Sequence, residues 1–267
     1  MKTIILTGDE TRHQFFRQRI AADPRITVLA TYCEGVEKSL EKRTQANPAA
    51  SALEMLHVLA RTQAEKDFFG DALRFGQDHS NPRRIAKGAI NDDEIVQDII
   101  ALKPELLVCY GASLVRSELL KRFEGRFLNV HLGLSPYYRG SGTNIWPLIN
   151  GEPGMVGATF MHINEGIDTG EIIHQIRADI FLGDSPHSIG NRLIAKMTDT
   201  YADLIARFPD LTREAQPQAE GTLYYQKDYD AAACQRLYDQ FSDNLILRHL
   251  TDPAPLPDLV ENAGLRR

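Results

Sequence analysis

The chain has 267 residues, of which 43% are hydrophobic and 25% charged, so it can bury the core of one or two domains. Its net charge of −6 argues against a protein whose main task is broad contact with a phosphate backbone, so nucleic acid is not an expected partner. Its apolar runs are far shorter than the ~20 residues of a membrane helix, and Met1–Ile4 enters a strand instead of a signal peptide. We therefore expect a cytoplasmic protein that acts on small substrates.

The chain opens as strand, turn, helix and strand, at Thr3–Thr7, 12–21 and Ile26–Tyr32. The turn contains Gly8 but no Gly-x-Gly-x-x-Gly pattern, so a Rossmann dinucleotide site is not predicted. Asp9 and Glu10 add negative charge where a phosphate would need amide donors. These acids favour the start of the helix instead and argue against an acceptor phosphate at this turn.

Residues 34–86 are rich in helical patterns, with Leu53, Leu56, Leu59 and Ala60 at helical spacing. This spacing predicts a helix packed on the sheet, and a role in shaping an acceptor pocket stays open as the alternative. His57 and His79 have no partner at metal-site spacing and are interpreted as ordinary core or surface histidines. Three cysteines, Cys33, Cys109 and Cys234, lack Cys-x-x-Cys spacing, so neither a zinc site nor a disulfide framework is predicted.

A helix begins near Asn91 with a cap and first-turn acids, buries Ile95, Ile99 and Leu102, and ends before Pro104. A strand at Glu105–Tyr110 follows it.

Two further apolar strands deliver polar residues to their ends. Phe127–Val130 stops at His131, and the period-two run 156–161 breaks just before Asp168. Polar groups at strand ends are where α/β enzymes place their chemistry, so Asn129, His131 and Asp168 are candidate catalytic residues.

The rest of the chain closes this domain and then changes character. A strand over 171–180 precedes a long helix over 185–208, whose inner face carries Ile189, Leu193, Ile194, Met197 and Leu204. We divide the chain into a catalytic domain, 1–210, and a small C-terminal extension, 211–267, with a short strand at 221–225 and a helix near 230–250.

Three motifs occur in a fixed order: Asn129-Val130-His131, Pro136-Tyr137-Tyr138-Arg139-Gly140 and Asp168-Thr169-Gly170, with Gly157-x-Thr159 between them. This set resembles the N10-formyltetrahydrofolate-dependent formyltransferases, a family that includes methionyl-tRNA and sugar N-formyltransferases. The resemblance is clear over 88–180, faint in the first strand and helix, and poor over 34–86. One departure concerns the loop after the histidine, because the family often has His-x-Ser-Leu-Leu-Pro where this chain has Gly133 and Ser135.

The resemblance implies an α/β, Rossmann-like formyltransferase fold with a mostly parallel central sheet and a short C-terminal extension. It also implies N10-formyltetrahydrofolate as the formyl donor. The cofactor-binding residues would be Ala112, Ser113, Leu114, Val115, Asn164, Glu165, Gly166 and Ile167.

Amine formylation needs a neutral amine, a stabilised oxyanion and a route for a proton, and it requires no metal. Asn129 and His131 are donors that suit an oxyanion hole, and Asp168 would orient or charge His131. An aspartic peptidase is disfavoured although Asp168-Thr169-Gly170 spells its triplet, because such enzymes need two facing carboxylates. A non-catalytic folate- or nucleotide-binding module is disfavoured because all three catalytic residue types are present.

The expected acceptor is the primary amine of a nucleotide-linked amino sugar, held by the loop 138–144 with Arg139, Ser141 and Asn144 as substrate-binding residues. The segment 221–229 resembles the post-catalytic segment of sugar N-formyltransferases. Only 57 residues, not basic in composition, follow residue 210, which disfavours the methionyl-tRNA alternative. Asp9 and Glu10 disfavour glycinamide ribonucleotide. A homodimer is compatible with the sequence.

Overall fold

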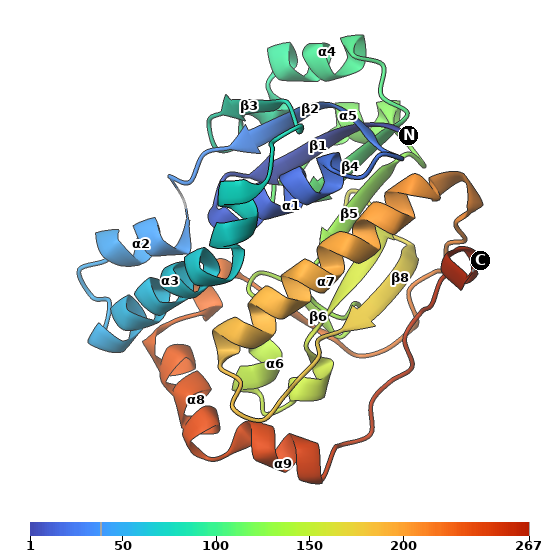
Figure 1. The fold of residues 1–267 in the computed structure, drawn as a ribbon. Helices are drawn as coiled ribbons and strands as arrows, with labels where there is room; N and C mark the ends of the chain where they lie inside the picture. Colours follow the sequence, from blue (N-terminus) through green and yellow to red (C-terminus); the bar gives the residue numbers. More distant parts are fainter. Residues whose placement is uncertain (38, 267) are drawn as a thin grey trace.

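The computed structural model describes residues 1–37 and 39–266 and centres on a seven-stranded sheet of order β3-β2-β1-β4-β5-β7-β8 (Figure 1). Five neighbouring strands are parallel: β1 (Lys2–Gly8), β2 (Thr27–Glu34), β3 (Pro82–Ile85), β4 (Leu106–Tyr110) and β5 (Phe127–His131). The last two, β7 (Gly157–His162) and β8 (Ile172–Arg177), each pair antiparallel with the preceding strand. The mostly parallel sheet predicted from the sequence is confirmed.

Helices cover both faces of this sheet (Figure 1). One face carries α1 (Thr11–Ala21) and α7 (Pro186–Ala206), and the other carries α4 (Asp93–Ala101) and α5 (Ser117–Arg122). The remaining helices are α2 (Leu40–Ala46), α3 (Ala52–Phe75), α6 (Trp146–Ile149), α8 (Ala231–Ser242) and α9 (Leu245–Thr251). Short 3-10 turns occur at Ala89–Asn91, Pro153–Met155, Phe208–Asp210, Gln226–Asp228 and Ala263–Arg266.

The alternation of side chains along β1 explains the two cores. Ile5 joins the apolar cluster under α1 and α7, whereas Ile4 and Leu6 join the cluster under α4 and α5. Because both faces are covered, the central strands read as continuous apolar runs in the sequence. The predicted inner residues of α7 are all buried, and so are the three cysteines.

The region 34–86 differs from its prediction. Helix α3 packs mainly on α1, α7, α2 and α8, and its buried side chains include His57, Val58 and Phe69. The predicted apolar stripe was wrong, because Leu56 is 62% and Leu59 50% exposed. The buried face of α3 is instead one that carries polar groups, since Glu65 is also buried there. The edge strand β3 was not predicted.

The C-terminal residues fold back onto the catalytic part of the chain (Figure 1). Glu214 bridges to Ile172 beside β8, and β9 (Thr222–Tyr224) pairs in parallel with β6 (Tyr138–Gly140). The predicted strand at 221–225 is therefore present. The predicted helix near 230–250 is two helices, because Asn244 adopts a left-handed conformation with φ of 55° between α8 and α9.

Among the helices that the structure describes, none is both long and apolar enough to cross a membrane.

Candidate active site

A cavity of about 1280 Å³ opens along the carboxyl ends of the parallel strands. Asn129 and His131 reach it from β5, and Asp168 reaches it from the loop between β7 and β8. The structure therefore brings Asp168 to Asn129 and His131, which lie far from it in the sequence. Ligands of open α/β sheets bind outside the carboxyl ends of the strands, as this cavity does.

His131 is held from both sides of its ring. Its Nδ1 lies 3.3 Å from Oδ2 of Asp168, and its Nε2 lies 3.0 Å from the carbonyl oxygen of Tyr138 and 3.1 Å from Oγ1 of Thr143. The same Asp168 oxygen accepts a hydrogen bond of 2.9 Å from the backbone N–H of Gly140. The imidazole is buried and fixed in orientation, as a group that moves a proton must be.

Gly133, which departs from the family pattern, makes room for one of these contacts. A Cβ atom at this position would lie 2.4 Å from His131 Nε2 and 2.8 Å from Cβ of Thr143. Thr143 uses the space, since its hydroxyl donates to the carbonyl oxygen of Leu132 at 2.7 Å while it contacts His131. The glycine and the threonine therefore act as a pair around the histidine.

The loop that carries Asp168 is stabilised by the C-terminal extension. Asp168 adopts a left-handed conformation with φ of 53°, which is costly for a residue other than glycine. The side-chain amide of Gln216 donates to the backbone oxygens of Asp168 and Gly170, at 2.8 and 2.9 Å. Gly170 itself packs so closely on His162 that a Cβ atom would lie 1.6 Å from the His162 oxygen, which explains the glycine of the Asp-x-Gly motif.

Asn129 faces the cavity from the centre of the sheet. It is half-buried, pairs with Met161 of β7 through the backbone, and its side chain makes no hydrogen bond to another described residue. Its amide is therefore a donor that a ligand in the cavity can use. Because both ring nitrogens of His131 already lie near protein groups, Asn129 is the more accessible donor of the two.

The predicted cofactor-binding residues, 112–115 and 164–167, all line the cavity. With Lys87 and Gly88 they form what we term the β4 end. Glu34 is fully buried there and accepts hydrogen bonds from Lys87 Nζ at 2.9 Å and from the backbone N–H groups of Gly88 and Ser113 at 2.8 and 2.6 Å. Burial favours a raised pKa for the Glu34 carboxyl, but Lys87 and the two N–H groups outweigh it and the pKa is lowered. Glu34 thus joins the segment that carries Lys87 and Gly88 to the segment that carries Ser113.

Two of the three predicted substrate-binding residues lie at the cavity, and the third does not. Ser141 and Asn144 line the cavity, whereas Arg139 is absent from the lining among the described residues and has a buried Nε without a partner. Arg139 lies on β6, where it pairs with Leu223 of β9. Leu114, one of the predicted cofactor-binding residues, lines the cavity but is 71% exposed.

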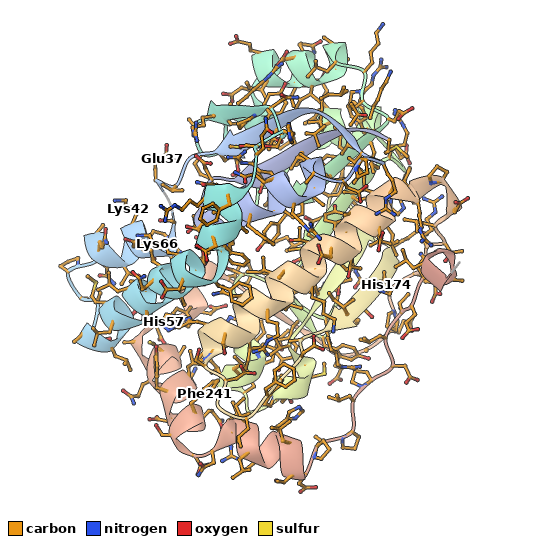
Figure 2. All side chains as sticks on the ribbon, in the orientation of Figure 1. Glu37, Lys42, His57, Lys66, His174 and Phe241 are labelled. Atoms are coloured by element: carbon orange, nitrogen blue, oxygen red, sulfur yellow. The ribbon has the colours of Figure 1, made fainter. Side chains whose placement is uncertain are left out.

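The opposite part of the cavity, which we term the α3 end, draws on the region 34–86, for which a role in shaping an acceptor pocket was the alternative interpretation, although none of its lining residues was predicted. It is lined by Arg43, His57, Arg61 and His187, and Figure 2 shows His57 on α3. His57 was interpreted as an ordinary histidine, because the pattern of a helix in the sequence does not reveal which of its sides faces a cavity.

The argument from Asp9 and Glu10 against an acceptor phosphate at the first turn also changes, because Asp9 pairs with Arg84 at 2.9 Å and Glu10 pairs with Arg12. Their charges are compensated.

Within residues 1–37 and 39–266, no group of three or more His, Cys, Asp or Glu side chains is placed to hold a metal ion.

Comparison with known proteins gives a consistent family. Residues 25–205 match a family model described as formyl transferase. The chain is 32% identical over 139 residues to a methionyl-tRNA formyltransferase of Finegoldia magna, an alignment that covers 49% of this chain and 43% of that relative. The matched part thus spans less than half of the relative's length.

Solved structures show the same fold. A sugar N-formyltransferase from a Shewanella species aligns with a TM-score of 0.56 and 21% identity, over 86% of this chain and 78% of that chain. Glycinamide ribonucleotide transformylase 1 from Symbiobacterium toebii aligns with a TM-score of 0.55 and 19% identity, over 81% of this chain and 93% of that chain. At these identities the likeness concerns the fold.

Proposed function

This chain belongs to the formyl transferase family, and we propose that it transfers a formyl group from N10-formyltetrahydrofolate to a primary amine of a nucleotide-linked amino sugar. The observation that carries the proposal is the contact of His131 with Asp168 beside Asn129, at the wall of a cavity large enough for two substrates. The conjunction matters because each residue alone has an ordinary structural explanation.

The reaction joins the amine nitrogen to the formyl carbon and breaks the bond from that carbon to N10 of the folate. Asn129 donates its amide to the formyl oxygen as negative charge develops there, which is how an oxyanion hole lowers the barrier. The proton that the amine loses passes through a water to N10, and His131, held in orientation by Asp168 and by the Tyr138 carbonyl oxygen, lies beside this route. The products are the formamide and tetrahydrofolate. Folate supplies the one-carbon unit, and the chain supplies orientation, charge stabilisation and the proton route.

The donor is proposed to occupy the β4 end. The backbone of Ala112 to Val115 and the loop Asn164 to Ile167 offer main-chain partners for a flat pterin ring, and Glu34 holds the first of these segments in place. The fold family uses such a donor, and the described residues offer polar groups at strand ends that suit it.

The acceptor is the finer part of the proposal, because the relatives differ in what their names say they act on. The Finegoldia relative is a methionyl-tRNA formyltransferase, while the two solved structures are a sugar and a glycinamide ribonucleotide enzyme. Residues 211–267 contain more acidic than basic side chains, which is unfavourable for a surface that binds tRNA phosphates. Tyr224 and Tyr225 from the extension line the cavity and suit a compact acceptor.

The deciding experiment is a competition in one reaction among charged initiator tRNA, glycinamide ribonucleotide and a panel of nucleotide-linked amino sugars. Mass spectrometry scores the gain of one formyl group in each. We expect formylation of a nucleotide-linked sugar and release of tetrahydrofolate. Formylation confined to the tRNA or to glycinamide ribonucleotide would overturn the proposed acceptor, and release of no tetrahydrofolate with any amine would favour the binding module.

A further inference from the structure

Three arginines line one wall of the cavity at the α3 end: Arg12, Arg43 and Arg61. Arg12 pairs with Glu10 and, at 2.9 Å, with Glu65. Arg61 shares Glu65, with its Nε 3.2 Å from the same carboxylate oxygen. The described part of this wall therefore contains three guanidinium groups but only two paired carboxylates, Glu10 and Glu65, so it has an excess of positive charge.

The unbalanced cation is Arg43. Within the described residues no carboxylate forms an ion pair with it, and its Nε is buried without a hydrogen-bond partner. Burial lowers the pKa of Arg43, and the like charge of Arg61 lowers this pKa further. Arg43 is partly buried and has no partner for its Nε, so an anion that enters the cavity would find an unpaired guanidinium donor.

Beside Arg61, the same end of the cavity carries neutral aromatic rings. The rings of His57 and His187 lie 5.0 Å apart, and Tyr229 lies 5.7 Å from His57. Burial lowers the pKa of His57 to about 3 and that of His187 to about 4, so both are neutral at pH 7. His187 Nε2 is buried without a partner. Flat neutral rings beside guanidinium groups suit a nucleoside diphosphate, with phosphate on the cations and the base against the rings.

The position of this wall indicates which substrate it serves. The β4 end packs into the core under α4 and α5 through Val115, whereas α3 packs through Phe69 into the core under α1 and α7. The two ends therefore lie on opposite faces of the sheet, and Asn129 and His131 lie between them at the carboxyl end of β5. If the donor occupies one end, the acceptor must approach from the other.

We propose that Arg43 and Arg61, with the neutral ring of His187, bind the diphosphate of the nucleotide-linked acceptor. This inference rests on the proposed function, which supplies the nucleotide-linked acceptor. The competing ligand is a folate with a glutamate tail, whose carboxylates are anions that the same arginines can bind. The diphosphate is favoured since the wall lies on the face opposite the β4 end.

The test compares affinities of the full chain for UDP, dTDP, inorganic pyrophosphate and 5-formyltetrahydrofolate by calorimetry. Arg43→Gln should weaken binding of pyrophosphate and of at least one nucleotide by roughly tenfold or more, because a charge-assisted hydrogen bond is lost. It should leave the 5-formyltetrahydrofolate affinity unchanged. Arg43→Lys, which keeps the charge but not the fork, should lose less. Arg74→Gln, at the exposed C-terminal end of α3, is the control and should change none of these affinities.

Two results would overturn the site: equal phosphate affinities in wild type and Arg43→Gln, or a loss confined to a diglutamate form of the folate. If Arg43→Gln fails to fold by circular dichroism, Arg43→Lys carries the comparison. Formyl transfer separates this site from the proposed function. Nucleotide-linked sugars that bind through Arg43 but gain no formyl group would overturn the function alone, whereas formylation with an unchanged KM in Arg43→Gln would overturn the site alone.

Discussion

The two ends of the cavity differ in how their charges are compensated. At the β4 end, Glu34 is saturated by Lys87 and by two backbone N–H groups, so its charge is used to hold loops. At the α3 end, Arg43 has no ion-pair partner among the described residues. A compensated buried charge stabilises the backbone around it, while an uncompensated one is available to a ligand. We therefore expect Glu34 to hold the site together and Arg43 to bind substrate.

The largest expected effect concerns the residues between the two ends. Asn129→Ala, His131→Ala and Asp168→Asn should each lower turnover by at least ~10²-fold, because each removes an oxyanion donor or its orienting group. Thermal melts should stay close to wild type. Initial-rate measurements of tetrahydrofolate release test this, and a folded variant with near wild-type turnover would remove that residue from the mechanism.

A smaller loss is expected from Gln216, a positioning residue in the extension. Gln216→Ala should lower kcat by about tenfold with little change in KM, because Asp168 loses a hydrogen bond that keeps its left-handed conformation. Gln216→Glu keeps the length but loses the donor, so it should not restore the rate. The exposed Gln218→Ala is the control. A change in KM alone would assign Gln216 to substrate binding instead.

Glu34→Gln tests the compensated end. The variant should weaken 5-formyltetrahydrofolate binding by roughly tenfold, because Lys87 loses its partner and Ser113 its charged acceptor. UDP binding should be unaffected. The exposed Glu124→Gln serves as the control. Loss of UDP binding in Glu34→Gln would mean that the two ends do not act separately.

The same carboxyl makes a prediction about pH. Because the pKa of Glu34 is lowered in the folded state, its stabilising effect is present above the unfolded pKa of a glutamate and is lost as the pH falls through the folded value. Wild-type melting temperature should therefore drop more steeply than that of Glu34→Gln on acidification below about pH 4.5. Parallel pH profiles for the two proteins would contradict this role.

The smallest effect is expected on the outer face of α3. Leu56→Ala and Leu59→Ala should each change the free energy of unfolding by less than ~0.5 kcal/mol, since both side chains are exposed. Val58→Ala, on the buried face between them, should cost about 2 kcal/mol. Denaturant unfolding of the three variants measures the difference. Equal losses would mean that the exposed leucines are covered in solution.

The sequence by itself determined the parts of the chain in which local pattern and tertiary role agree. Continuous apolar runs identified the central strands, because those strands are buried on both faces and any exposed register would be costly. The long apolar stripe predicted α7, and the ordered motifs drew attention to Asn129, His131 and Asp168, which the structure brings to one cavity. The glycines of these motifs have a physical reason in the structure, since Gly170 packs against the backbone of His162.

Only the tertiary structure decided the contacts between distant segments. Nothing local in α3 indicates that its leucines face outward and that His57 and Glu65 face inward, because the choice depends on where α1, α7 and the cavity lie. The pairing of β6 with β9 and the hydrogen bonds from Gln216 to the Asp168 loop join residues about 50 or more positions apart. Such contacts leave no periodic signal in the sequence, since either partner alone is an ordinary polar or loop residue. The uncompensated charge of Arg43 is likewise a property of the assembled wall, where neighbouring arginines outnumber the carboxylates.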